Sequence, residues 1–145
     1  MSRSANIANA WPDVNSDGDR VGPVEILKQH AENFNDNPGF NFAKAFVSSV
    51  PGDGPDLFFH TLYLSLKKNN SYKVQVVTVK SRIDGSDMTL WEGPYAKEEV
   101  EVENQRALIA TLGAIIGSKR TAFLIRNLND MSKTIEDHYT NLSTD

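Results

Sequence analysis

The chain has 145 residues, a formal net charge of −4 and a pI near 5.3. This length is typical of one domain, and a chain of this size buries roughly 70% of the surface that its unfolded form exposes, enough for a core without cross-links. The sequence contains no cysteine, which excludes disulfides, thiolate nucleophiles and every cysteine-based metal centre. The acidic balance of the whole molecule argues against binding to nucleic acid or to an anionic membrane.

The first 20 residues differ in composition from the rest of the chain. They are rich in Asn, Asp, Ser and Gly and follow neither a helical nor a strand period. This predicts a flexible polar leader at residues 1–20 and a single domain at residues 21–145. The leader lacks the apolar run of a secretory signal, and the chain nowhere has about 18 consecutive apolar residues, the length of a membrane span. We therefore expect a cytoplasmic protein that does not contact a membrane.

A helix is predicted at residues 23–35, where the domain begins. Pro23 suits the first position of a helix, because that position needs no backbone N–H donor. Residues 35–39, Asn-Asp-Asn-Pro-Gly, end the helix. Its apolar residues recur at the spacing of one helical face, and they are Val24, Ile26, Leu27, Ala31 and Phe34.

Strand-like stretches follow at residues 40–50, 57–67 and 72–80, and residues 88–91 predict a short fourth strand. Turn-forming residues occupy each gap between these stretches. The gap at residues 68–71 contains two asparagines, which tolerate a positive φ. We therefore expect the second and third strands to form a tight hairpin.

Alternation within residues 57–67 divides the second strand into two faces. Phe59 and Tyr63 lie on one face. His60 lies on the other face with the leucines, which are expected to point into the core. His60 is therefore interpreted as a hydrogen-bonded histidine of the core or its rim. The leucines of this face are Leu62, Leu64 and Leu66.

Two helices are predicted after the strands. Residues 103–116 carry apolar side chains at helical spacing, and Gly117 suits the end of that helix. Ser118 can cap the helix that follows. The apolar stripe of this last helix consists of Phe123 or Leu124, then Leu128, Met131 and Ile135.

The order of helix, strands, helix and helix lacks the alternation of strands and helices that a parallel sheet requires. The predicted fold class is α+β, with an N-terminal helix, an antiparallel sheet of three to four strands and two C-terminal helices packed on one face. The second face of the sheet would be open to water or to a partner. The candidate partner-binding residues are Phe59, Tyr63, Lys73, Gln75, Trp91 and Tyr95. For Tyr63, Trp91 and Tyr95 taken singly, packing in the core is favoured over a role in contact.

Residues 13–19, Asp-Val-Asn-Ser-Asp-Gly-Asp, match the first half of a calcium-binding loop. Asp13, Asn15 and Asp17 place oxygen ligands at alternate positions. The twelfth position is Val24, where a bidentate glutamate is required. A solvated turn is therefore favoured over a calcium site, and we expect neither a metal nor a cofactor.

Motifs for catalysis are incomplete. The chain has no Gly-x-Ser-x-Gly elbow, and Gly113, Gly117, Ser118 and Lys119 lack the spacing of a phosphate loop. His30 and His138 lie on predicted helices without a second metal ligand at i+4, which leaves His60 as the candidate general base. We therefore predict no catalytic residue. The alternative is a hydrolase or isomerase that uses His60 with a nearby aspartate or Tyr63.

Three segments occur in order along the domain: VEILKQHAE at residues 24–32, HTLYLSLKKNNSYKVQVVTVK at residues 60–80 and GSKRTAFLIRNL at residues 117–128. Together they resemble a small uncharacterised family of bacterial α+β domains, over about residues 23–130. The resemblance implies a fold, in which an opening helix leads to a sheet with a hairpin and a serine-capped helix closes the chain. It carries over no catalytic residue.

The leading functional hypothesis is a small non-catalytic binding or regulatory protein, of the immunity or accessory-factor kind, that acts through contact with another protein. It depends on the acidic balance, the spare sheet face and the missing reactive group. A homodimer similar to a secretion chaperone is the alternative among binding proteins. The net charge disfavours nucleic-acid binding through a basic hairpin, whose residues would be Lys67, Lys68, Lys73 and Arg82.

Overall fold

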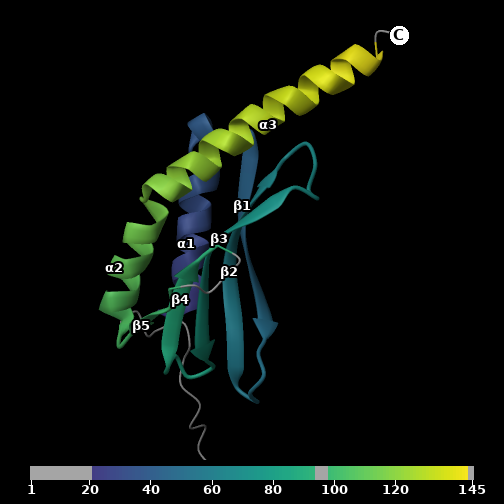
Figure 1. The fold of residues 1–145 in the computed structure, drawn as a ribbon. Helices are drawn as coiled ribbons and strands as arrows, with labels where there is room; N and C mark the ends of the chain where they lie inside the picture. The colour runs from purple at the N-terminus through teal and green to yellow at the C-terminus, as the bar shows by residue number, and fades with distance from the viewer. Residues whose placement is uncertain (1–20, 94–97, 144–145) are drawn as a thin grey trace, which may run out of the picture.

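The computed structural model describes residues 21–93 and 98–143, with residues 136–143 described by their backbone alone. The predicted leader at residues 1–20 lies outside this part of the chain. The described residues form an α+β domain with a five-stranded antiparallel sheet and three α-helices (Figure 1). The strands lie in the sheet in the order in which they occur in the chain. The elements are α1 (Pro23–Asn35), the short 3-10 helix η1 (Pro38–Phe40), β1 (Ala43–Pro51), β2 (Leu57–Leu66), β3 (Lys73–Arg82), β4 (Met88–Glu92), β5 (Val100–Val102), α2 (Gln105–Ile116) and α3 (Lys119–Ser143).

Helix α1 forms where it was predicted. Pro23 is its first residue, and Asp36 ends it. Phe34 in its last turn stacks on Phe40 of η1, with ring centroids 4.7 Å apart, which joins the helix to the segment that leads into β1. The face of α1 that packs on the sheet is apolar, and its buried residues are Pro23, Ile26, Leu27, Ala31 and Phe34.

Strands β2 and β3 form the predicted hairpin, but its turn differs from the expectation. Neither asparagine of residues 68–71 has a positive φ. Instead the side-chain oxygen of Asn69 accepts a hydrogen bond from the N–H of Ser71 at 3.0 Å, and its carbonyl accepts one from Tyr72. Because the asparagine side chain supplies an acceptor within the turn, the hairpin closes without a left-handed residue at these positions.

A β-bulge at Val76 decides which side chains of β3 face outward. Leu62 pairs with Val77, but the next residue, Tyr63, pairs with Gln75, so Val76 has no residue opposite it in β2. Plain alternation would place Gln75 and Val77 on the same face of the sheet. The bulge moves Gln75 to the side of Tyr63, while Val77 points into the core.

The sheet has five strands, where three to four were predicted. The additional strand, β5, pairs antiparallel with β4, with Val102 opposite Met88. Val102 is the only buried residue of the three in β5, and glutamates alternate with its valines. A strand of this length is too short to show a period, so the pairing with β4 defines it and its own sequence does not.

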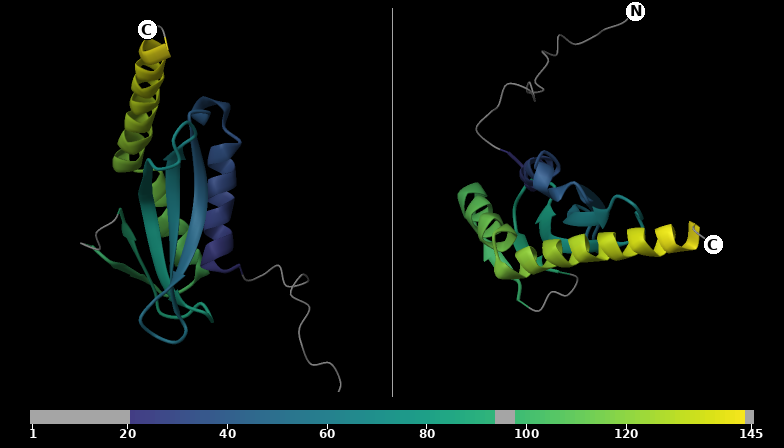
Figure 2. Two further views of the ribbon diagram at one scale, coloured as in Figure 1. Left: turned by 90° about the vertical axis from the view of Figure 1, so that its right-hand side faces the viewer. Right: turned by 90° about the horizontal axis from the view of Figure 1, so that it is seen from above.

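Helices α1 and α2 cover one face of the sheet, whereas α3 departs from the prediction that both C-terminal helices lie there (Figure 1 and Figure 2). Gly117 ends α2 and Ser118 caps α3, as predicted, and the two helices meet there at a bend of 48°. Because of this bend, α3 crosses the edge of the sheet and runs on toward its uncovered side. Within the described residues no single helix is long and apolar enough to span a membrane, although α2 and Lys119–Ile135 meet that criterion when they are combined across the bend.

The core lies between the sheet and the helices. On α3, Leu128 is buried, and Ile125, Met131 and Ile135 pack against the same cluster, which confirms most of the predicted stripe. Phe123 does not belong to the stripe, because its side chain is 61% exposed. The large side chains that are fully buried come from both layers: they are Leu27, Leu66, Leu90, Leu108, Leu112, Val76, Val77 and Val79.

Candidate binding surface and cleft

One face of the sheet is left uncovered by α1 and α2, and the left view of Figure 2 shows it toward the viewer. We call it the open face. The strand register places five of the six predicted contact residues on it: Phe59, Tyr63, Lys73, Gln75 and Trp91. The sixth, Tyr95, lies outside the described residues. The register also brings other side chains to this face, chiefly Lys44, Phe46, Thr61, Thr78 and Lys80.

Two aromatic pairs form across neighbouring strands of the open face. Phe46 of β1 stacks on Tyr63 of β2, with ring centroids 5.2 Å apart. Phe59 meets Trp91 of β4 edge to face at 6.0 Å. Phe46, Phe59 and Tyr63 are half-buried, but Trp91 is only 9% exposed. Trp91 therefore supports Phe59 by packing and adds little contact area of its own.

A buried hydrogen bond joins the middle of the open face. The hydroxyl oxygens of Thr61 and Thr78 lie 2.9 Å apart on adjacent strands, and both side chains are buried. Both side chains belong to the open face, since Thr61 lies opposite Thr78 in the register of β2 and β3. A polar pair of this kind stabilises the register of β2 against β3.

Lysines give the open face a positive charge over β1 to β3. Lys73 lies over the ring of Tyr63, with its Nζ atom 5.0 Å from the ring centroid. Lys44 lies in the same row, since both lysines are opposite Ser65, and Lys80 lies beside Phe59. The far side of the face, at β5, carries the carboxylate of Glu101 opposite Thr89.

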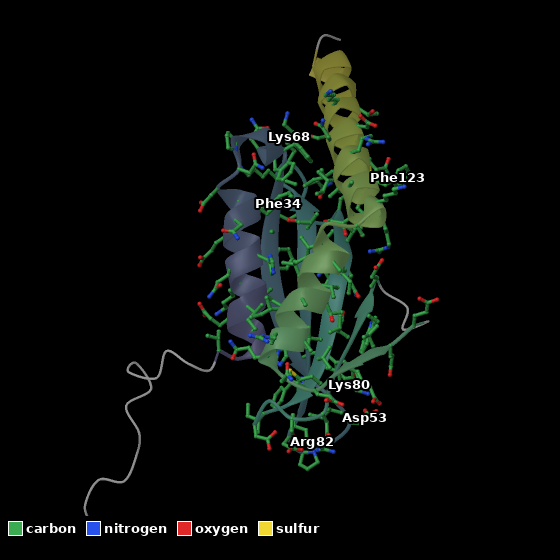
Figure 3. All side chains as sticks on the ribbon, turned by 90° about the vertical axis from the view of Figure 1, so that its left-hand side faces the viewer. Phe34, Asp53, Lys68, Lys80, Arg82 and Phe123 are labelled. Atoms are coloured by element: carbon green, nitrogen blue, oxygen red, sulfur yellow. The ribbon has the colours of Figure 1, made fainter. Side chains whose placement is uncertain are left out.

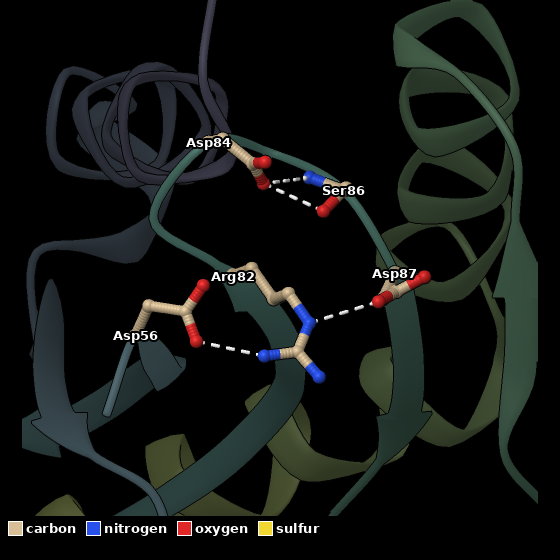
Figure 4. A network of polar contacts seen from close by, with 5 residues as sticks. All are labelled: Asp56, Arg82, Asp84, Ser86 and Asp87. Atoms are coloured by element: carbon tan, nitrogen blue, oxygen red, sulfur yellow. Dashed lines mark hydrogen bonds and ion pairs between the residues drawn. The ribbon is translucent and has the colours of Figure 1, made fainter. Parts of the chain in front are cut away.

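The residues of the predicted basic hairpin do not all come together. Lys68 and Arg82 lie at opposite ends of the molecule (Figure 3). Arg82 is also engaged with two carboxylates, since its Nε donates to Asp87 at 2.9 Å and its Nη1 donates to Asp56 at 2.7 Å (Figure 4). Hydrogen bonding, first to Asp87 and then to Asp56, raises the pKa of Arg82 above its ordinary value. Arg82 is therefore separated from Lys68 and is paired with two carboxylates.

The edges of the sheet are partly closed against an added strand. On β1 the side chain of Asn35 occupies the outward backbone groups of Ala45, and Pro51 has no N–H to donate. Where β4 ends beside β3, the N–H of Gly93 and the guanidinium of Arg120 both donate to the carbonyl of Val76. These contacts occupy some of the outward backbone groups of β1 and β3.

On the helix-covered side of the sheet, a cleft of about 880 Å³ lies between the starts of α1 and α2 and the turn from β3 to β4. Both helices begin at this lower end of the molecule, as the view of Figure 3 shows. The floor of the cleft consists of side chains that are almost fully buried, namely His60, Ser81, Met88 and Leu108. Its mouth includes the charged side chains of Arg106 and Glu103.

His60 is a hydrogen-bonded histidine at the rim of the core, as predicted. Its Nδ1 atom lies 2.7 Å from the hydroxyl oxygen of Ser49. Burial lowers the pKa of His60 below 6.5, so the ring is neutral at pH 7. Tyr63 lies on the opposite face of the sheet, and the carboxylate of Asp84 in the cleft accepts hydrogen bonds from Ser86. The described residues therefore do not pair His60 with an acid or with Tyr63.

Other sequence-predicted sites fall outside the described part of the chain. The calcium-loop residues Asp13, Asn15 and Asp17 lie outside it, and so does the side chain of His138. Among the residues that the structure describes, no group of three or more His, Asp or Glu side chains could hold a metal ion. The calcium interpretation therefore stays a prediction.

Two features of these sites were not predicted. Phe46 belongs to the open face, and its spacing from Val50 by an even number of residues could have indicated that both side chains share a face. The cleft had no comparable signal, because its floor and mouth come from four separate parts of the chain. Only the packing of α1 and α2 on the sheet brings them together.

The interpretation of the open face and of the cleft depends on the residues of this chain alone. No protein-family model, no curated protein and no solved structure matches it.

Proposed function

We propose that this protein is a non-catalytic binding protein that contacts another protein through the open face of its sheet. The observation that carries the proposal is the pair of cross-strand aromatic contacts, Phe46 with Tyr63 and Phe59 with Trp91, on a face that α1 and α2 leave uncovered. Aromatic side chains offer large contact areas at a low cost in conformational entropy, and they are enriched at the centres of protein interfaces.

The rigidity of this face supports the same function. The Thr61–Thr78 hydrogen bond and the ring contacts hold the side chains in place before a partner arrives. Less ordering is then required on binding, which raises affinity for a given contact area. The partly closed edges of the sheet favour contact through its face over the addition of a strand.

The charges indicate the chemistry of the partner. Lys44, Lys73 and Lys80 lie around the aromatic residues. A partner surface with apolar side chains at its centre and carboxylates around them would complement this arrangement. A single-stranded nucleic acid fits less well, because stacking of bases requires free ring faces, and the ring of Tyr63 is already stacked on Phe46 and approached by Lys73.

A photo-crosslinking experiment tests the proposal. Tyr63 is replaced by p-benzoylphenylalanine, and the matched control carries the same group at Phe123, an exposed aromatic residue on α3. We expect irradiation in an extract of the source cell to give one defined adduct at position 63 and none at position 123. The purified adduct partner should then lose about 30-fold or more in affinity for a Tyr63→Ala variant, the size of effect that marks a central interface residue.

Two outcomes would count against this proposal. Equal crosslinking at positions 63 and 123 would mean that the open face has no preference for a partner. A crosslink between two copies of this chain at position 63 would instead support the homodimer hypothesis, and light scattering would then report a dimer. An immunity or accessory role would follow from the identity of a captured partner.

A further inference from the structure

The cleft at the starts of α1 and α2 lies on the other side of the sheet from the open face, so it is a site separate from that of the proposed function. Apolar side chains form much of its lining. Two of them are exposed to water, since Ile83 is 75% exposed and Ile109 is 46% exposed. Exposed apolar side chains that line one cleft favour an apolar occupant. The other apolar residues of the lining are Val21, Pro23, Val24, Met88 and Leu108.

Carboxylates outnumber guanidinium groups at the cleft and on Arg82. Arg82 is paired with two aspartates, and hydrogen bonds from Ser86 lower the pKa of Asp84, which is therefore ionised at pH 7. An anion is disfavoured there, and an apolar occupant without carboxylates is favoured. The acidic residues are Asp56, Asp84, Asp87 and Glu103, and the basic residues are Arg82 and Arg106.

The described part of the chain begins at a wall of this cleft. Val21 lines the cleft, and its N–H donates a hydrogen bond to the Oε1 atom of Gln105 at 3.0 Å. Gln105 is the first residue of α2 and lines the same cleft. This bond attaches the backbone before α1 to the start of α2. The residues that precede Val21 are therefore tethered at the cleft itself.

The tethered residues include a segment whose chemistry matches the cleft. Residues 7–12, Ile-Ala-Asn-Ala-Trp-Pro, carry two large apolar side chains, those of Ile7 and Trp11. Residues 1–12 contain Arg3 and no carboxylate, because the first aspartate of the chain is Asp13. Residues 12–20 link this segment to Val21, and such a link reaches up to roughly 30 Å when it is extended. That reach exceeds the width of a cleft of about 880 Å³.

We propose that residues 7–12 bind in the cleft of the same chain, with the Trp11 side chain against Ile83 and Ile109. Burial of an indole covers roughly 150 to 250 Å² of surface, which supports a contact of modest strength. A short tether holds the segment at an effective concentration on the order of 1 mM. A contact with a dissociation constant of about 0.1 mM is then bound about ten times as often as it is free. The protein thereby covers apolar surface that would otherwise favour association with other molecules.

A spin label on the full chain tests the proposal. Because the chain has no cysteine, Ala10→Cys provides a single position for a nitroxide. We expect the label to broaden the amide NMR signals of Ile83 and Ile109 but not that of Lys68, which lies at the opposite end of the molecule (Figure 3). Adding Trp11→Ala should weaken the contact at least about tenfold, which lowers the bound fraction from about nine-tenths to about one half and the broadening about twofold or more.

Two exposed apolar residues provide matched variants of the labelled chain. Ile83→Asp places a charge at the mouth of the cleft and should reduce the broadening at Ile109. Phe123→Asp makes the same change on α3, where the side chain is 61% exposed, and should leave the broadening unchanged. Near-UV circular dichroism shows that each variant keeps its fold. Tyr63→Ala on the open face should also have no effect.

The proposal is overturned if Ile83 and Ile109 broaden no more than Lys68 does, or if Trp11→Ala leaves their broadening unchanged. Equal effects of the two aspartate variants would overturn it as well. A mixture of spin-labelled chains with isotope-labelled chains that carry no nitroxide detects contacts between copies. Broadening of the same strength in this mixture would assign the segment to the cleft of a second copy and reject the contact within one chain. None of these results bears on whether the open face contacts a protein.

Discussion

Asn35, the last residue of α1, pairs with the backbone of Ala45 in the way that a neighbouring strand would. Its side-chain oxygen accepts a hydrogen bond from the Ala45 N–H at 2.8 Å, and its side-chain nitrogen donates to the Ala45 carbonyl at 2.9 Å. One side chain thereby attaches α1 to β1 and occupies backbone groups at the exposed edge of the sheet.

Replacing Asn35 by alanine should destabilise the protein and open this edge. The partly buried backbone groups of Ala45 would lose two partners, so we expect the free energy of unfolding to fall by about 1–3 kcal/mol. Free edge groups also promote association of strands from different molecules. Urea unfolding and size-exclusion chromatography measure the two effects. The control is Asn127→Ala on the exposed side of α3, and equal behaviour of both variants would contradict this role of Asn35.

Two threonines of the open face should respond in opposite ways to the same substitution. The hydroxyl oxygen of Thr89 is buried without a hydrogen-bond partner in the described part of the chain. Thr89→Val removes this unsatisfied group, and we expect the free energy of unfolding to rise by about 1 kcal/mol. Thr78→Val breaks the buried bond to Thr61 and should lower it by about 1–2 kcal/mol. Chemical denaturation of both variants gives the comparison, and a loss of stability in Thr89→Val would refute the assignment.

A side chain at Gly93 should destabilise the protein, for two reasons. Its φ is +68°, a left-handed conformation that disfavours other residues, and an added Cβ would lie 2.6 Å from an Arg120 guanidinium nitrogen. Gly85 also has a positive φ, but a Cβ there would meet open space. We therefore expect Gly93→Ala to lower the midpoint of thermal unfolding more than Gly85→Ala does.

A second background isolates the contact with Arg120. In Arg120→Ala the added methyl group at position 93 meets no guanidinium, so the cost of Gly93→Ala should approach that of Gly85→Ala. If Gly93→Ala lowers the midpoint of thermal unfolding by the same amount with and without Arg120, backbone strain at Gly93 accounts for the whole effect.

Stability should increase with pH across the range in which His60 titrates. Burial lowers the pKa of His60 in the folded state below 6.5, so the unfolded chain binds more protons between the folded-state pKa and 6.5. The stabilisation is complete above about pH 6.5 and is lost as the pH falls through the lower pKa. The free energy of unfolding, measured with urea, should therefore be lower at about pH 5.5 than at about pH 8. This difference should be smaller in His60→Asn.

His30 provides the control for this pH dependence, because burial lowers its pKa in the same direction. His30→Asn should remove its own part of the pH dependence and leave that of His60. An NMR titration of the two rings assigns each part to its residue. If the His60 ring titrates at or above 6.5, the explanation by burial is wrong.

Local patterns in the sequence were sufficient for the elements that depend on residues close in the chain. Pro23, Gly117 and Ser118 mark helix boundaries through the backbone groups of their own turns, and the alternation along β2 separates His60 from Tyr63. These signals act within a few residues. They therefore do not depend on where the rest of the chain lies.

The surfaces depended on contacts between distant parts of the chain. The bulge at Val76 places Gln75 on the open face, which alternation alone would have placed beside Val77. Arg82 is paired with Asp56, which precedes β2, and Phe59 of β2 packs edge to face against Trp91 of β4. In each case the position of a side chain depends on a contact with another segment. Periodicity within its own segment does not indicate that contact.

The sequence by itself determined the class of fold, the hairpin and the division of β2 into a core face and an outer face, because hydrophobic periodicity and turn chemistry are properties of neighbouring residues. Only the tertiary structure decided that β5 joins the sheet, that α3 bends across its edge, and that His60 and Ser81 line a cleft with the starts of two helices. Those features arise from packing between segments that are far apart in the chain. The energy of such packing depends on both segments, so the sequence of one segment alone does not indicate it.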